Sequence, residues 1–113
     1  SMISKEDGNI DFSKTARQID CFVRGMSPWP SAFTHVLGKT LKVFKVEKSD
    51  CNVENIHSFE FGQVVKSSAK DGLFVKVADG VVRLSEIQLE GGKRMSDNAF
   101  LLGRNVEIGT KFE

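Results

Sequence analysis

The chain has 113 residues, of which 40% are hydrophobic and 27% are charged, and its formal net charge is +1. This length allows one small domain with a single core, and excludes a nucleotide-binding domain followed by a second domain. Because the net charge is close to zero, any case for nucleic-acid binding depends on where the charges lie.

The N-terminal residues 1–8 are expected to be an expression scar followed by the remnant of a linker, with one domain over residues 9–113. Ser1-Met2 is not followed by the apolar stretch of a signal peptide, and Gly8-Asn9 is a turn signal. No apolar run approaches the ~20 residues of a membrane span. We therefore expect no membrane partner, and we also expect the protein to be cytoplasmic and monomeric.

An amphipathic helix is predicted over residues 13–24. Ser13 is a good N-cap, and Gly25 is a typical C-terminal stop. Between them, apolar residues recur at helical spacing: Ala16, Ile19, Phe22 and Val23.

A stiff corner follows this helix, formed by Pro28-Trp29-Pro30. Each proline fixes its own φ angle and disfavours the helical region for the residue before it, so the corner should be extended. Two interpretations of Trp29 stay open. It is either a hydrophobic plug between the helix and the strands, or a surface on which a base stacks.

The rest of the chain has a strand-like pattern with glycine-containing turns. The expected strands are residues 32–37, 40–46, 63–66, 73–77 and 81–89, with a turn at Gly38-Lys39 and a polar loop over residues 47–59. Ser96 or Asp97 should cap a short helix that ends at Gly103. The predicted fold is mainly β, a small OB-fold-like barrel of five to six strands, with one α-helix before it and a short helix near the C-terminus.

The sequence offers no catalytic or metal-binding constellation. It has no GxSxG, HExxH or glycine-rich phosphate loop, and His35 and His57 have no neighbouring nucleophile. Cys21 and Cys51 lack metal-ligand spacing, so we interpret them as reduced thiols. The acidic residues at predicted turns are expected to be structural, namely Asp71, Asp79 and Asp97. This chain alone should be inactive.

A binding surface formed by basic residues is the remaining possibility. On a regular strand successive residues face opposite sides, so at most two of the lysines spaced three apart from Lys39 to Lys48 can share one side. Lys93-Arg94 is the strongest pair, because a glycine-rich loop allows close approach to phosphates. The simpler interpretation of each candidate is a solvated cation that keeps the domain soluble. The candidates are Arg24, Lys39, Lys42, Lys45, Lys66, Lys93 and Arg94.

Eight short motifs follow one another along the chain from about Gly8 to Gly109. They are Val23-Arg24-Gly25, Pro28-Trp29-Pro30, Gly38-Lys39, Gly62-Gln63-Val64-Val65, Asp71-Gly72-Leu73-Phe74-Val75, Asp79-Gly80-Val81-Val82-Arg83-Leu84, Glu86-Ile87-Gln88-Leu89 and Gly92-Lys93-Arg94-Met95. In this order they resemble the C-terminal domain of methionyl-tRNA formyltransferases. Ser31, Phe61 and Arg94 depart from the residues usual in that family.

The resemblance implies an OB-like domain that holds initiator methionyl-tRNA. It would be attached to an N-terminal catalytic domain that transfers a formyl group from 10-formyltetrahydrofolate to the tRNA-bound methionine. The catalytic and folate-binding residues of the family belong to that N-terminal domain. Another interpretation stays open, in which the domain is a structural part of a different formyl-transferring enzyme, sugar- or folate-processing, that does not bind RNA.

Overall fold

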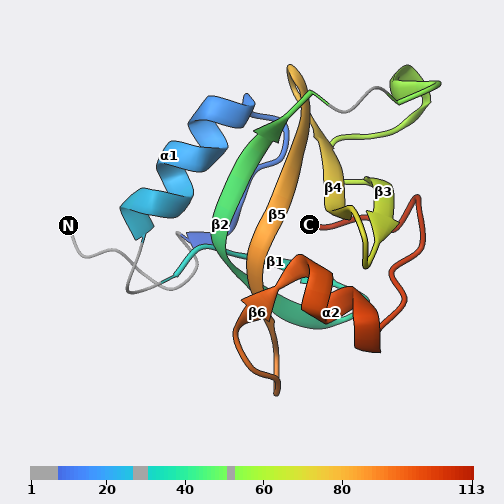
Figure 1. Ribbon diagram of the computed structural model, residues 1–113. Helices are drawn as coiled ribbons and strands as arrows, with labels where there is room; N and C mark the ends of the chain where they lie inside the picture. The colour runs from blue at the N-terminus through green and yellow to red at the C-terminus, as the bar shows by residue number, and fades with distance from the viewer. Residues whose placement is uncertain (1–7, 27–30, 51–52) are drawn as a thin grey trace.

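A computed structural model describes residues 8–26, 31–50 and 53–113 of the chain (Figure 1). The predicted corner at Pro28, Trp29 and Pro30 lies outside the described residues, as does Cys51. Both interpretations of Trp29 therefore stay predictions.

One antiparallel sheet forms the body of the domain (Figure 1). Helix α1 packs against β2, and α2 contacts β4 and β5. The strands of the sheet follow the order β1-β2-β5-β4-β3, and β6 pairs with β5. The predicted mainly-β fold, with one helix before it and a short helix near the C-terminus, is confirmed. The elements are α1 (Ala16–Met26), β1 (Phe33–Val36), β2 (Lys39–Ser49), η2 (Ile56–Ser58), β3 (Val64–Ser68), β4 (Gly72–Val77), β5 (Gly80–Leu89), β6 (Met95–Ser96) and α2 (Asp97–Gly103).

The sheet is not closed into a barrel by strand pairing, because β1 and β3 form its two edges. The C-terminal tail spans this opening with backbone hydrogen bonds to both sides. Glu113 N donates to His35 O on β1 at 2.9 Å, and Phe112 N donates to Gly62 O, just before β3, at 2.8 Å. The expected barrel closure is thus not confirmed, and the tail covers the edges that strands would otherwise have paired.

Helix α1 begins later and ends later than the sequence pattern predicts. Thr15 and Gln18 form a capping box, in which Gln18 Oε1 accepts from Thr15 N at 2.9 Å and Thr15 Oγ1 accepts from Gln18 N at 3.2 Å. Ser13 instead donates to the Asp11 carboxylate. Gly25 lies inside the helix, so the predictions that Ser13 caps it and Gly25 ends it are wrong.

The two faces of the sheet carry separate apolar clusters. The larger one contains the inner residues of the strands, the buried face of α1 and Phe112 of the tail. The smaller cluster consists of Val65, Phe74 and Val81, covered by the segment that includes η2. Strand β4 is consequently buried on both faces, which explains its continuous apolar run.

Candidate nucleic-acid interface

A bulge in β2 decides which of its lysines share a face. The pairing with β5 runs through Val43 and then resumes at Lys45, which leaves Phe44 without a partner in the ladder. Such an extra residue resets the alternation of side chains. The bulge therefore places Lys45 on the same face as Lys42, and both residues are exposed. Without it, strict alternation would place Lys45 on the face of Lys39.

Phe44 is covered by a basic residue from the loop after β5. Strand β6 pairs with β5 through Glu86 and Ile87, which brings Arg94 over β2. The Arg94 guanidinium carbon lies 4.1 Å from the centroid of the Phe44 ring, and Arg94 Nε pairs with the Glu86 carboxylate. Both interactions position Arg94, while its side chain stays 57% exposed.

Lys42 approaches the same loop from β2. It lies opposite Gln88 in the ladder, and Gln88 Nε2 donates to Gly92 O at 3.0 Å, one residue before Lys93. Lys42, Lys45 and Lys93 are exposed, and none of them forms an ion pair with any residue that the structure describes. We call the group Lys42, Phe44, Lys45, Lys93 and Arg94 the Phe44 patch.

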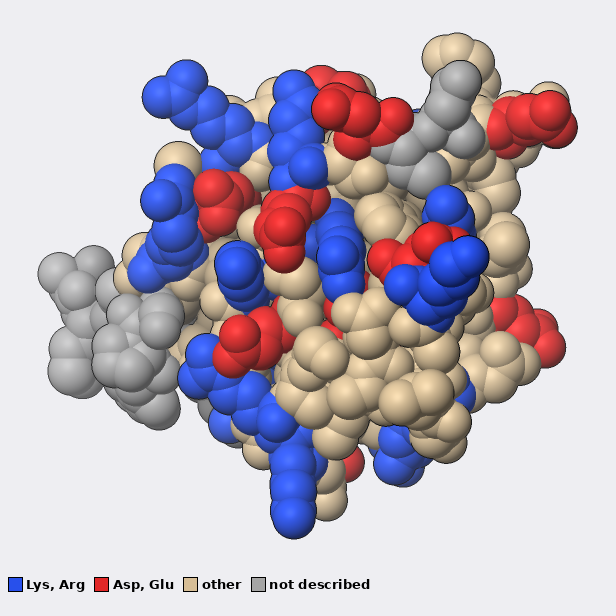
Figure 2. Space-filling model, in the orientation of Figure 1, with Lys and Arg blue, Asp and Glu red and all other residues tan. Residues whose placement is uncertain are grey.

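Acidic side chains are interspersed with the basic ones on this face (Figure 2). Basic side chains lie over the upper left and centre of that view, and a further group extends to its lower edge, where Figure 1 places the loop between β5 and β6. Both signs of charge thus share this face, which agrees with the near-zero net charge.

Three of the predicted basic residues lie outside the patch. Arg24 pairs with Asp20 on its own helix at 3.2 Å. Lys66 pairs with Asp71 at 3.7 Å and lies over the Phe74 ring. Lys39 lies beside Leu41, on the face of β2 opposite to Lys42.

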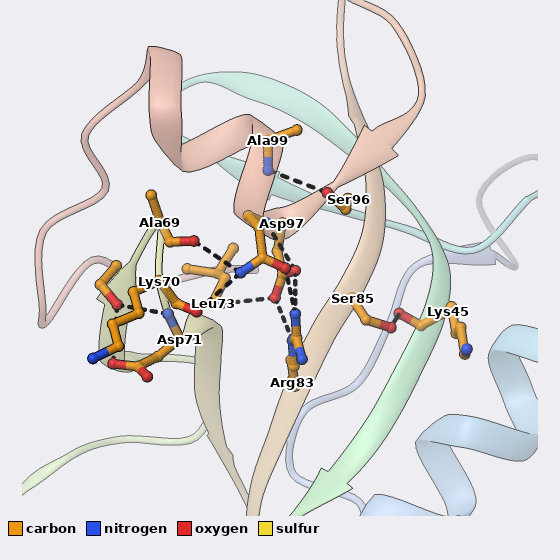
Figure 3. Close-up of polar contacts among 12 residues, drawn as sticks. Lys45, Ala69, Lys70, Asp71, Leu73, Arg83, Ser85, Ser96, Asp97 and Ala99 are labelled. Carbon is orange, nitrogen blue, oxygen red and sulfur yellow. Dashed lines mark hydrogen bonds and ion pairs between the residues drawn. The ribbon is translucent and has the colours of Figure 1, made fainter.

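A second arginine, Arg83, is fixed inside the structure by Asp97 (Figure 3). The Asp97 side chain is completely buried and accepts from Arg83 Nε at 2.7 Å, Arg83 Nη2 at 2.9 Å and Leu73 N at 2.9 Å. The hydrogen bond to Asp97 raises the pKa of Arg83 above its ordinary value, against the opposing effect of burial. Arg83 is consequently a structural cation.

The role of Asp97 was only partly predictable. Ser96 is the N-cap of α2 and accepts from Ala99 N at 3.1 Å, as one of the two alternatives expected. Asp97 follows it and joins α2 to β4 and β5 instead of capping the helix. The close approach of β4 requires Gly72, whose φ is +112° and whose added Cβ would lie 2.7 Å from Arg83 Nε.

Over the described ranges, no three His, Cys, Asp or Glu side chains gather as they would around a metal ion. In the same ranges, no helix has the length and apolar character needed to span a bilayer.

The family model for the formyl transferase C-terminal domain matches residues 2–105. Methionyl-tRNA formyltransferase of Halothermothrix orenii is 39% identical over 110 residues, covering 96% of this chain and 35% of the relative. The Agathobacter rectalis protein of the same name is 41% identical over 112 residues, covering 99% and 34%. The chain thus spans about a third of the length of these curated relatives.

A solved structure shares the fold at low sequence identity. The crystal structure of HypX from Aquifex aeolicus, in an A392F-I419F variant, matches with a TM-score of 0.62 at 15% identity. The match covers 97% of this chain and 21% of that chain.

Proposed function

Since the chain belongs to the formyl transferase C-terminal domain family, we propose that it is the tRNA-binding part of an enzyme like methionyl-tRNA formyltransferase. The parent enzyme would transfer a formyl group from 10-formyltetrahydrofolate to initiator methionyl-tRNA in the cytoplasm. Its catalytic residues would lie outside this chain, which would position the RNA against the catalytic domain.

One observation carries this proposal: three lysines of β2 and of the loop after β5 are exposed and form no ion pair in the described residues, and the Arg94 guanidinium of the same loop lies over the Phe44 ring of β2. Lys42, Lys45 and Lys93 can each turn an ammonium group toward a phosphate, at little cost in lost internal contacts. Arg94 is already oriented by Phe44 and Glu86, so less conformational entropy is lost when it contacts RNA.

The patch suits recognition of the RNA backbone rather than a base sequence. Phosphate contacts hold a nucleic acid in register without reading its bases. Phe44 is half-buried beneath Arg94, so the face offered to RNA is a guanidinium plane. Such a plane can stack on an unpaired base or pair with a phosphate.

The proposal is tested by titrating labelled initiator methionyl-tRNA with the chain at low salt and measuring fluorescence anisotropy. The variant Lys42→Ala/Lys93→Ala should weaken binding about tenfold, because it removes two phosphate contacts. The matched control is Lys14→Ala/Lys70→Ala, which removes the same charge from two other exposed positions. Equal losses in both variants, or no binding by the wild-type chain, would contradict the proposal and favour a structural domain that does not touch RNA.

In the full-length parent enzyme, the same patch variant should raise KM for methionyl-tRNA and leave kcat nearly unchanged. That outcome is expected when a contact binds substrate and transition state equally. A fall in kcat at unchanged KM would place the role of the patch in the chemical step instead.

A further inference from the structure

An apolar pocket of about 160 Å³ lies between the β1–β2 turn, the end of α2 and the segment after it. Leu41, Leu89, Phe100 and Val106 contribute its apolar lining, and all but Leu41 keep 7–8% of their surface exposed. Lys39 and Arg104 also line it. Because Leu41 and Lys42 point to opposite faces of β2, this pocket is separate from the Phe44 patch.

Leu37 is held at the pocket in an unfavourable conformation. The two-residue turn between β1 and β2 has φ of 50° at Leu37 and 80° at Gly38, and such turns favour Asn or Gly. A left-handed conformation costs a leucine about 1–2 kcal/mol. Leu37 is 82% exposed, so it regains little of that cost by packing within the described residues. Strained residues of this kind concentrate at ligand-binding sites.

The size of the pocket fits one large apolar side chain. An engineered cavity of ~150 Å³ in another protein accepts benzene, whereas whole small-molecule sites are usually about 300–1,000 Å³. Few polar atoms line the pocket, Asn105 being its one neutral polar residue, so a nucleobase would leave most of its edge groups unpaired.

Two cations beside the pocket determine which residues would fit on either side of an apolar side chain bound in it. Lys39 and Arg104 are exposed and form no ion pair within the described ranges. The nearby Glu90 carboxylate accepts instead from Thr40 N at 3.1 Å. A partner with carboxylates on both sides of its apolar residue would complement this arrangement.

We propose that this pocket anchors one aromatic or large aliphatic side chain of an acidic peptide segment from a partner protein. Leu37 covers the anchor, and Lys39 and Arg104 pair with the flanking carboxylates. This inference does not depend on RNA binding, because its residues are distinct from the Phe44 patch.

The test is a titration of the chain, uniformly labelled with ¹⁵N, by three capped tripeptides. Glu-Phe-Glu should shift the amide signals of Leu37, Phe100 and Val106 saturably, with a millimolar Kd. Lys-Phe-Lys and Glu-Ala-Glu should bind at least tenfold more weakly, because each lacks one of the two matching features. Absence of saturable shifts, or equal affinity for the three peptides, would overturn the proposal.

Two leucine variants separate binding from folding. Leu37→Asn suits the left-handed turn, so the variant should fold and should bind Glu-Phe-Glu at least fivefold more weakly. Leu102→Asn removes a similarly exposed leucine, 80% exposed, that does not line the pocket, and should change affinity less than twofold. Equal effects would overturn the proposal. The proposal would also be overturned if a short single-stranded RNA, and not Glu-Phe-Glu, shifted the amide signals of the pocket residues. The same holds if raising the protein concentration alone shifted them.

Discussion

Two arginine–carboxylate pairs link β5 to the segment that follows it, and they differ mainly in burial. Asp97 is completely buried and the Arg83 side chain is 29% exposed, whereas Glu86 and Arg94 are 35% and 57% exposed. Breaking a buried pair leaves an uncompensated charge, while an exposed pair is replaced by water at little cost. The same chemistry therefore stabilises the fold at Arg83 and leaves Arg94 available to a ligand.

The largest expected effect is that of Asp97→Ala. This variant leaves the Arg83 guanidinium and the Leu73 N–H group without their buried acceptor, so the free energy of unfolding should fall by about 3–5 kcal/mol. Chemical denaturation measures the loss, with Glu86→Ala as the control. Glu86→Ala should cost less than about 1 kcal/mol. Comparable losses of unfolding free energy in the two variants would contradict the claim that the buried ion pair stabilises the fold more than the exposed one.

Gly72→Ala should be the next most disruptive change. The added methyl group would overlap the Asp97 carboxylate and lie 2.7 Å from Arg83 Nε, at a φ of +112° that alanine rarely adopts. We expect a loss of about 2–3 kcal/mol in the free energy of unfolding. Gly91 also has a positive φ, of 81°, but has open space around it, so Gly91→Ala should be less destabilising. A Gly72→Ala variant as stable as the wild type would show that the Arg83–Asp97 contact is loosely packed.

Thr34→Val should stabilise the domain. Thr34 is fully buried, and its Oγ1 has no hydrogen-bond partner among the described residues, in contrast to the fully bonded Asp97. Replacing the hydroxyl by a methyl group removes its desolvation penalty, which should add about 1 kcal/mol to the free energy of unfolding. Thermal unfolding should show a higher Tm than the wild type. A lower Tm would mean that the Thr34 hydroxyl forms a hydrogen bond in solution, which the variant loses.

Arg94→Ala should have the smallest effect on stability. Its exposed ion pair and its stacking on Phe44 together contribute less than about 1 kcal/mol. Affinity for tRNA should nevertheless fall in this variant.

Glu86→Gln should raise the affinity for tRNA a few-fold, because Glu86 competes with phosphate for Arg94. The effect of Glu86→Gln is measured by anisotropy beside the wild type, and unchanged affinity would show that the pair does not limit binding.

Local patterns predicted the five longer strands, because apolar alternation and turn residues act over short distances. Two of the predicted bounds were wrong: the turn after β1 lies at Leu37-Gly38 instead of Gly38-Lys39, and β2 continues to Ser49, into the predicted loop over residues 47–59. The β2 bulge could also have been predicted, since two residues separate Val43 from Val46 where alternation allows one. The capping box at Thr15 and Gln18 was likewise present in the sequence.

Contacts between distant residues were not predictable in the same way. The pairing of Asp97 with Arg83 and the tail that spans β1 and β3 depend on how remote segments meet. Among the basic residues, Lys93 and Arg94 were singled out from their glycine-rich loop, but the partners of Arg94, Phe44 and Glu86, emerge only from the register of the ladder. The RNA-binding role of these residues stays a prediction.

The most direct test of the central claim is the salt dependence of tRNA binding. The logarithm of the association constant should fall linearly with the logarithm of salt concentration for the wild-type chain. For Lys42→Ala/Lys93→Ala the slope should become shallower by about 2, while Lys14→Ala/Lys70→Ala keeps the wild-type slope. Identical slopes for the three proteins, or binding that salt does not weaken, would contradict the account.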